Sequence, residues 1–316
     1  MLSALNMFVI NLDHTPERMR EFQQINAHLP NVTRFPAIDG KSVGHKTLIE
    51  RGIFAPPIFY KDGSVGNTLS HRELWMMAAE RGEIITAFED DAIIHKDFET
   101  LAPAMIAKLR PDWDMVVWGW NFDAALSFDL FPSVPCLAHF SQADMRNQWE
   151  AIQKDAIQPS LHRHHYAFGT IAYSVSPAGA KRIAALAFPI RPFLHQLPRH
   201  NIEVENLTVD CVLSTLFDRL NVYVCIPPLV LTKNDHAAST VQVGWHGRPF
   251  ARIRRLKQRL SGMSPLPQDD NGFRLTPSAH YPNSREFTRK FAHYLYKNGD
   301  KLGAARKYLK HLCMRR

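Results

Sequence analysis

The sequence has few cysteines, and they form none of the usual cysteine motifs. Cys136, Cys211, Cys225 and Cys313 are widely separated, and no CxxC pair occurs. This spacing excludes the common zinc-binding and dithiol redox motifs. Unpaired thiols are typical of a reducing compartment, so we expect reduced, mostly buried cysteines in a cytoplasmic protein.

Long apolar runs are also missing. No stretch approaches the roughly 20 apolar residues that a transmembrane helix requires. The opening residues, MLSALNMFVINLD, carry no basic segment and lead directly into a predicted strand, so we expect no signal peptide. The sequence contains neither a P-loop nor an internal repeat, which argues against the common phosphoryl-transfer design and against a repeat protein.

Positive charge is concentrated at one end of the chain. The net charge is +8 over 316 residues, yet residues 251–316 alone hold 16 Lys and Arg against 4 Asp and Glu, a balance of +12. Residues 1–250 are therefore at −4. A basic pI thus says little about the main body, and a nucleic-acid partner is not expected. We predict two regions, a domain over 1–245 and a basic C-terminal region over 246–316.

The main body reads as an α/β domain. Apolar, β-rich runs predict strands at 5–12, 32–40, 84–88, 113–120, 169–176 and 221–230, and helical patterns predict helices at 15–28, 67–80, 97–109, 177–187 and 207–219. Residues 121–165 read as loop mixed with helix and run into the histidine-rich LHRHHY at 161–166. Strands that alternate with helices predict a mostly parallel sheet covered on both faces, with ligands at the carboxyl ends of the strands.

Three consecutive carboxylates, Glu89, Asp90 and Asp91, follow the predicted strand 84–88. In extended chain, residues i and i+2 point to the same side, so Glu89 and Asp91 could converge on one cation. Hard divalent ions such as Mg²⁺ and Mn²⁺ prefer carboxylate oxygens and often share substrate phosphates with a small protein ligand set. The alternative is a solvated cluster that only ends the strand. Spacing alone does not decide between them.

The order of several motifs is more specific. The segments are VINLDHTPERM (9–19), AIDG (37–40), GNTLSHRELW (66–75), FEDDAII (88–94), GTIAYSVSPAGAKRI (169–183), VDCVL (209–213) and IPPLV (226–230). In this order they resemble glycosyltransferase family 25, over roughly residues 6–240. The connection at 139–165 looks longer than is usual in that family, and the basic C-terminal region has no counterpart in it.

The resemblance implies a nucleotide-binding fold of the GT-A type, a UDP-sugar donor (usually UDP-galactose), Mn²⁺ or Mg²⁺, and inversion at the anomeric carbon. We assign the metal to Asp91 first and Glu89 second. His236, which follows the last predicted strand, is a further candidate ligand, and the alternative is a loop histidine without a role. Asp90 is then expected to touch the donor sugar or ribose. Inversion also needs a base for the acceptor hydroxyl. Asp210 is our candidate, although Asp in a first helical turn could serve only to cap the helix.

The same resemblance predicts the donor-binding residues. The loop from Asn11 to Arg18, which includes Asp13, is expected against the nucleoside, with Asp39 near the base or ribose. Arg18 could bind the diphosphate or pair with an acidic neighbour. Ser70 and His71 are expected on a helix facing the same crevice, while Trp75, one turn later, is expected in the core. The predicted donor contacts are therefore Asn11, Asp13, Arg18, Asp39, Ser70, His71 and Asp90.

The basic C-terminal region alternates cations with apolar residues. This pattern is typical of an amphipathic helix that contacts anionic lipid, and it equally fits a helical hairpin packed on the catalytic domain. A membrane contact would suit a lipid-linked oligosaccharide acceptor at the inner face of the inner membrane. The sequence therefore predicts a metal-dependent inverting glycosyltransferase, a galactosyltransferase acting on lipooligosaccharide. Two alternatives stay open: a nucleotidyl or phosphoryl transferase that uses the same carboxylates, and a non-catalytic glycan- or nucleotide-binding module.

Overall fold

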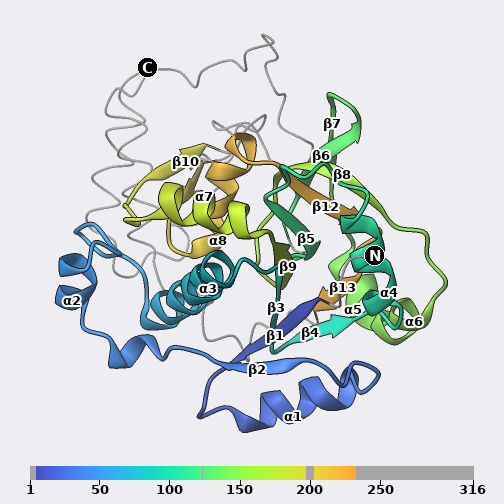
Figure 1. Ribbon diagram of the computed structural model, residues 1–316, viewed down its shortest axis with the longest axis horizontal. Coiled ribbons are helices and arrows are strands. Elements are labelled where there is room, and N and C mark those ends of the chain that lie inside the picture. Colours follow the sequence, from blue (N-terminus) through green and yellow to red (C-terminus); the bar gives the residue numbers. More distant parts are fainter. Residues whose placement is uncertain (1–4, 123, 197–202, 233–316) are drawn as a thin grey trace, which may run out of the picture. The chain divides into compact units, whose positions relative to one another are not determined.

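The computed structural model describes residues 5–122, 124–196 and 203–232, and these form a mixed α/β domain (Figure 1). The strands are β1 (Asn6–Asn11), β2 (Thr33–Pro36), β3 (Ile85–Glu89), β4 (Ala92–Ile94), β5 (Met115–Gly119), β6 (Leu126–Phe131), β7 (Val134–Ala138), β8 (Ser160–Tyr166), β9 (Ala172–Val175), β10 (Leu194–Gln196), β11 (Glu203–Glu205), β12 (Val222–Ile226) and β13 (Val230–Thr232). The α-helices are α1 (Pro16–Ile25), α2 (His45–Glu50), α3 (Asp62–Arg81), α4 (Phe98–Ile106), α5 (Gln142–Asn147), α6 (Trp149–Lys154), α7 (Pro177–Ala187) and α8 (Val209–Leu216). Short 3₁₀ turns cover Gly40–Ser42 and Phe217–Arg219.

The central sheet has nine strands in the order β2-β1-β3-β9-β5-β12-β8-β6-β7. Strand β1 runs parallel to β2 and β3, and β5 runs parallel to β12. Strand β9 lies antiparallel between β3 and β5, and β8, β6 and β7 pair antiparallel beyond β12. The prediction of a mostly parallel sheet is therefore only partly correct, because the sheet is mixed.

Side chains alternate between two cores, one on each face of the sheet. Ile10, Ala87 and Val117 join the core beneath α3, α7 and α8, while their neighbours Val9 and Phe88 join the core beneath α1 and α4. Such alternation follows from the two-residue period of a strand. Figure 1 shows the two groups of helices on the two sides of the strands.

Most predicted elements are present with shifted ends. The helix predicted at 177–187 is α7 with the same bounds, and the helix predicted at 67–80 begins five residues earlier, at Asp62. The strand predicted at 221–230 divides into β12 and β13, because Pro227 and Pro228 lie between them and cannot donate to a strand ladder. Thr15 precedes α1 as predicted, but its hydroxyl donates to the Leu12 carbonyl instead of accepting from the helix.

The prediction of loop mixed with helix for residues 121–165 was only partly correct, because α5 and α6 lie there but so do three strands. This segment contains the β6–β7 hairpin, and LHRHHY belongs to β8 rather than to loop or helix. Strand β8 is covered on both faces at its end, where His164, His165 and Tyr166 are all buried. A strand buried on both sides loses its polar–apolar alternation, and the buried histidines hide the remaining apolar signal.

Helix α3 contacts the loop after β2 at a glycine. A Cβ added to Gly66 would collide with the Ile38 carbonyl oxygen and lie 2.8 Å from the Gly40 amide nitrogen. Ser70, one turn later, fastens the same loop, since its hydroxyl donates to the Gly66 carbonyl and accepts from the Ile38 amide. Glycine at position 66 therefore lets α3 approach the loop that leads from β2.

We expect Gly66→Ala to lower the free energy of unfolding by about 3 kcal/mol, because overpacking against backbone atoms leaves nothing flexible to move. Urea denaturation of the purified protein would measure this loss. Gly44→Ser is the control, since a Cβ there meets no atom closer than the Thr47 hydroxyl at 3.9 Å and serine is a favoured residue before a helix. Equal stability of the two variants would contradict the packing argument.

The predictions for the domain boundary and the C-terminal region cannot be compared with the structure. The boundary at 245/246 and the whole basic region 246–316 lie outside the described residues. Within the described residues, no helix is both long enough and apolar enough to cross a membrane. In the same part of the chain Cys136, Cys211 and Cys225 are free thiols, and the last two are buried as predicted.

Candidate functional site

The three consecutive carboxylates lie where β3 ends and turns into β4. Strand β1 ends beside them at Asn11, because β1 and β3 are parallel neighbours. Strand β9 runs the other way, so its beginning meets the end of β3. Three chain segments thus converge on one edge of the sheet, and each carboxylate faces different partners there.

Asp90 is held by the residues of the first strand and helix. One of its oxygens accepts from the Arg18 guanidinium, with Nε at 2.9 Å, and the other accepts from the Asn11 amide at 2.7 Å. Of the two roles predicted for Arg18, the structure shows the pairing with an acidic neighbour. The pair fixes the start of α1 against the acidic turn and balances the charge of Asp90.

Glu89 is held by α3 and by the segment before β9. Its Oε1 accepts from the Thr170 hydroxyl at 2.6 Å and from the Asn67 amide at 3.4 Å, and it lies 3.6 Å from His71 Nε2. Burial alone would raise the pKa of Glu89, but the hydrogen bond and charge of His71, with the Thr170 hydroxyl, lower it. Glu89 is therefore an ionised carboxylate, with 24% of its side chain exposed.

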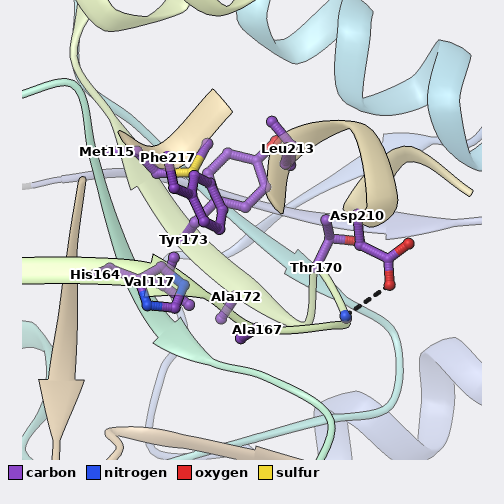
Figure 2. Close-up of a pocket in the computed structure, with 11 residues that line it drawn as sticks. Met115, Val117, His164, Ala167, Thr170, Ala172, Tyr173, Asp210, Leu213 and Phe217 are labelled. Atoms are coloured by element: carbon purple, nitrogen blue, oxygen red, sulfur yellow. Dashed lines mark hydrogen bonds between the residues drawn. The ribbon is translucent and has the colours of Figure 1, made fainter. Parts of the chain in front are cut away.

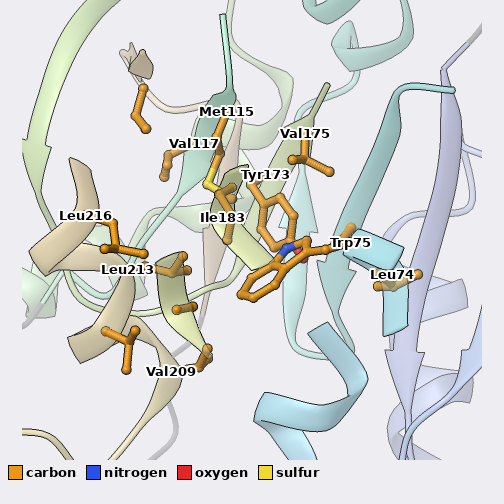
Figure 3. Packing of buried hydrophobic residues seen from close by; sticks show 14 of the residues in the cluster. Leu74, Trp75, Met115, Val117, Tyr173, Val175, Ile183, Val209, Leu213 and Leu216 are labelled. Atoms are coloured by element: carbon orange, nitrogen blue, oxygen red, sulfur yellow. The ribbon is translucent and has the colours of Figure 1, made fainter. Parts of the chain in front are cut away.

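His71 lies behind Glu89 rather than at the surface. The ring is fully buried, and its Nδ1 is 3.0 Å from the Tyr173 hydroxyl on β9. Tyr173 in turn packs beside Trp75 in the core (Figure 3). The core position predicted for Trp75 is confirmed, since it has no exposed surface. The two ring nitrogens of His71 face Tyr173 and Glu89, so His71 orients the Glu89 carboxylate from the side of the core.

Asp91 has the least satisfied carboxylate of the three. Its Oδ2 accepts from the Thr232 hydroxyl at 3.1 Å, whereas its buried Oδ1 has no hydrogen-bond partner among the described residues. Burial, followed by the charge of Glu89, raises the pKa of Asp91 to about 7. A buried anionic oxygen without a donor is costly unless a proton or a cation neutralises it.

Asp210 lies in the first turn of α8 and reaches the same edge of the sheet. Its Oδ2 accepts from the Gly169 amide at 2.8 Å, and its Oδ1 accepts from the Cys211 amide at 2.9 Å and from the Thr208 hydroxyl. Figure 2 shows this carboxylate beside Thr170. Burial raises the pKa of Asp210, and the charge of Glu89 adds to that rise. Consecutive residues Gly169 and Thr170 therefore connect Asp210 to Glu89.

A narrow pocket lies next to Asp210 (Figure 2). Its volume is only about 10 Å³, and its walls are mostly apolar, including Val117, Leu213 and Phe217. His164 also lines it, and burial lowers the pKa of this histidine to about 3, so the ring is neutral. The pocket therefore gives Asp210 a low-dielectric wall, which is consistent with the raised pKa of its carboxyl group.

The other predicted donor residues lie at or just after the ends of β1 and β2, and on α3. Arg34 joins them, because its guanidinium donates to the Asn11 side-chain and backbone oxygens and to Asp13 at 2.6 Å. Asp13 is exposed and Asp39 is half-buried, and Asp39 also accepts from the Lys41 amide. Ser70 is buried and bonded to protein groups on both sides. Whether any of these residues contacts a donor stays a prediction.

Some residues of the site carry no signal that sequence reasoning used. Asn67 could have been found, since it lies four residues before His71 on one face of α3. Thr170, Tyr173 and Arg34 depend on which strands pair, which the pattern did not settle. His236 lies outside the described residues. Within those residues, no group of three or more His, Cys, Asp or Glu side chains is arranged to hold a metal ion.

The fold and this site together define a class. A large mixed sheet between helices, with an acidic turn at a strand end, is compatible with a Rossmann-like glycosyltransferase fold. The family model described as "Glycosyltransferase family 25 (LPS biosynthesis protein)" matches residues 4–205. The chain belongs to glycosyltransferase family 25.

Curated relatives agree with this assignment. A protein named "Glycosyltransferase 25 family member" from Drosophila melanogaster is 26% identical over 196 residues, which cover 58% of this chain and 28% of that protein. A protein of the same name from Drosophila pseudoobscura pseudoobscura is 26% identical over 231 residues, covering 69% and 31%. A mouse protein named "Inactive glycosyltransferase 25 family member 3" is 25% identical over 236 residues, covering 67% and 32%. The chain thus spans about a third of the length of these relatives.

Proposed function

We propose that this protein is a metal-dependent, inverting glycosyltransferase with a GT-A-type fold. It moves a hexose, galactose in our proposal, from a UDP-sugar to a cell-surface glycan of the lipooligosaccharide kind. One observation carries the proposal: Gly169 and Thr170, adjacent in the chain, hold Asp210 and Glu89. A candidate base and a candidate cation site thus lie together at the edge of the sheet where ligands of such folds bind.

The residues present fit a hard divalent cation at Asp91. Its buried Oδ1 has no donor in the part of the chain that the structure describes, and a carboxylate oxygen of this kind is the ligand that Mn²⁺ and Mg²⁺ prefer. Glu89, already bonded to Thr170, would be the second ligand, and His236 remains a candidate. A small protein ligand set suits an ion that shares the diphosphate of its substrate. When bound, the cation supplies positive charge that stabilises the departing diphosphate.

Asp210 has the chemistry of a general base in this proposal. A base works best when its pKa approaches the working pH, and burial moves the pKa of Asp210 in that direction. The Gly169 amide and the Thr208 hydroxyl fix its orientation. Asp210 Oδ would take the proton of the acceptor hydroxyl as that oxygen attacks the anomeric carbon and the carbon–phosphate oxygen bond breaks.

The ends of β1 and β2 are the proposed nucleoside side. Exposed Asp13 and half-buried Asp39 are acceptors that could bind ribose hydroxyls or the base, and Arg34 holds Asn11 and Asp13 in place. Asp90 would orient Arg18 toward the diphosphate or touch the sugar itself. We further propose that residues 246–316 bring the protein to anionic lipid at the cytoplasmic face, where a lipid-linked acceptor is found.

A non-catalytic module is the second candidate, and a specific observation favours it. Each oxygen of Glu89 and Asp90 named above already has a protein partner, which is also what a purely structural acidic turn would show. The Asp91 oxygen that has no donor among the described residues, and the half-buried carboxylate of Asp210, favour the enzyme. A nucleotidyl or phosphoryl transferase would use the same carboxylates with a different acceptor.

A donor screen separates these candidates. We expect the purified protein to release UDP from UDP-galactose in the presence of Mn²⁺, and to stop when the cation is chelated. Turnover would be measured as UDP formed, and binding as the shift in melting temperature with UDP plus Mn²⁺. A thermal shift without turnover of any nucleotide sugar would support the binding module. Release of pyrophosphate or phosphate instead of UDP would support the other transferases.

A further inference from the structure

A second hollow lies away from the acidic turn. It is a solvent-open groove of about 520 Å³ between the end of α1 and helix α6. Both helices pack on β4 (Figure 1). Arg18, which reaches the acidic turn, is in the first turn of α1, whereas the groove uses residues from Gln24 to His28 at the opposite end. The groove is therefore separate from the site described above.

The floor of this groove is built by buried hydrogen bonds. The Gln153 side-chain amide donates to the carbonyls of Ile25 and Ile94, and the Lys96 amide donates to the Gln153 carbonyl. Beside it, the buried ring of His95 lies 2.9 Å from the Asp155 carbonyl oxygen. These hydrogen bonds join α1, β4 and α6, so they fix the positions of the elements that line the groove.

The walls combine one large aromatic ring with charged and amide groups. Trp149 lines the groove and is partly exposed, and Gln24 and Glu150 are exposed beside it. Lys96 and Lys154 add two cations against the single carboxylate of Glu150, and His28 is a third basic group. Lys96 also lies 4.0 Å from exposed Asp97, which offsets part of its charge.

We propose that this groove binds an acidic saccharide. An indole offers a flat surface to the apolar face of a sugar ring, while an amide and a carboxylate can donate to and accept from its hydroxyls. The two lysines provide the point charges for a carboxylate or phosphate on the sugar. Glu150 and Asp97 offset only part of the positive charge of Lys96, Lys154 and His28, so the groove favours an acidic sugar over a neutral one.

The test is a binding measurement that needs no catalysis. Saturation-transfer NMR with the intact protein would compare 3′-sialyllactose with lactose, which differ by one acidic sugar. We expect 3′-sialyllactose to bind at least about tenfold more tightly. Lys154→Glu should weaken it by about tenfold or more, whereas Lys108→Glu, an exposed site outside the groove with the same charge change, should have little effect. Trp149→Ala should remove the saturation transfer.

The outcomes are separable from the proposed function. Asp91→Asn should leave 3′-sialyllactose binding unchanged, because Asp91 lies at the other site. Equal binding of the two saccharides, equal effects of the two lysine substitutions, or loss of binding in the Asp91 variant would each overturn the groove assignment. None of these results would bear on UDP release from a nucleotide sugar.

Discussion

Replacing Asp91 by asparagine is expected to abolish sugar transfer while the protein stays folded. The substitution keeps the shape of the side chain and the acceptor for Thr232, but it removes the charge on the buried Oδ1. Charge stabilisation by a bound metal is worth several kcal/mol, and each 1.4 kcal/mol is a tenfold change in rate, so the loss should be at least about a thousandfold. Manganese-dependent release of UDP is the measurement. Asp97→Asn, at a half-exposed carboxylate after β4, is the control.

The same variant should change how stability depends on pH. The pKa of Asp91 is about 7 in the folded chain against an ordinary value of 3.8, so the folded state holds its proton more tightly. The contribution of Asp91 to the stability of the wild type should therefore fall as the pH rises from about 4 to about 7. Without divalent cations Asp91→Asn should lack this loss, and at pH 8 it should melt at a higher temperature than the wild type. Parallel pH profiles, or unchanged manganese-dependent turnover, would refute the assignment.

Asp210→Asn is expected to lower kcat by about 10²–10⁴-fold, the usual contribution of a general base, with little change in KM for the donor. Asparagine keeps one oxygen to accept from the Gly169 amide, so the fold and the start of α8 should survive. Kinetics at saturating donor, with melting temperature beside them, would test this. If kcat is unaffected, Asp210 only holds the start of α8 against the Gly169 segment.

Local pattern was sufficient for much of the fold and for the place of the acidic turn. Apolar runs located β1, β3 and β5, and Pro177 marked the start of α7, because these signals depend only on neighbouring residues. The direction of β9 could not be obtained in this way. An antiparallel strand and a parallel strand share the same composition when both faces are buried, and only the pairing partners distinguish them.

That limit explains which site residues were missed. Thr170 reaches Glu89 only because β9 begins where β3 ends, so its role depends on strand order rather than on its own neighbours. The partners of Asp90 are different. Asn11 lies in the motif VINLDHTPERM, at the end of a predicted strand. Parallel pairing of that strand with β3 brings Asn11 and Asp90 together.

Gly169 and Thr170, which hold Asp210 and Glu89, are neighbours in the chain, so the spacing between their Cα atoms is fixed. Neighbouring Cα atoms are about 3.8 Å apart across a trans peptide, and no repacking of helices alters that spacing. The residues that hold the carboxylates of Asp210 and Glu89 are thus joined by a covalent bond. Elsewhere in the domain, substitutions in the core can change the spacing between elements. A single residue inserted between Gly169 and Thr170 would therefore change the relative positions of Asp210 and Glu89 more than many substitutions in α7.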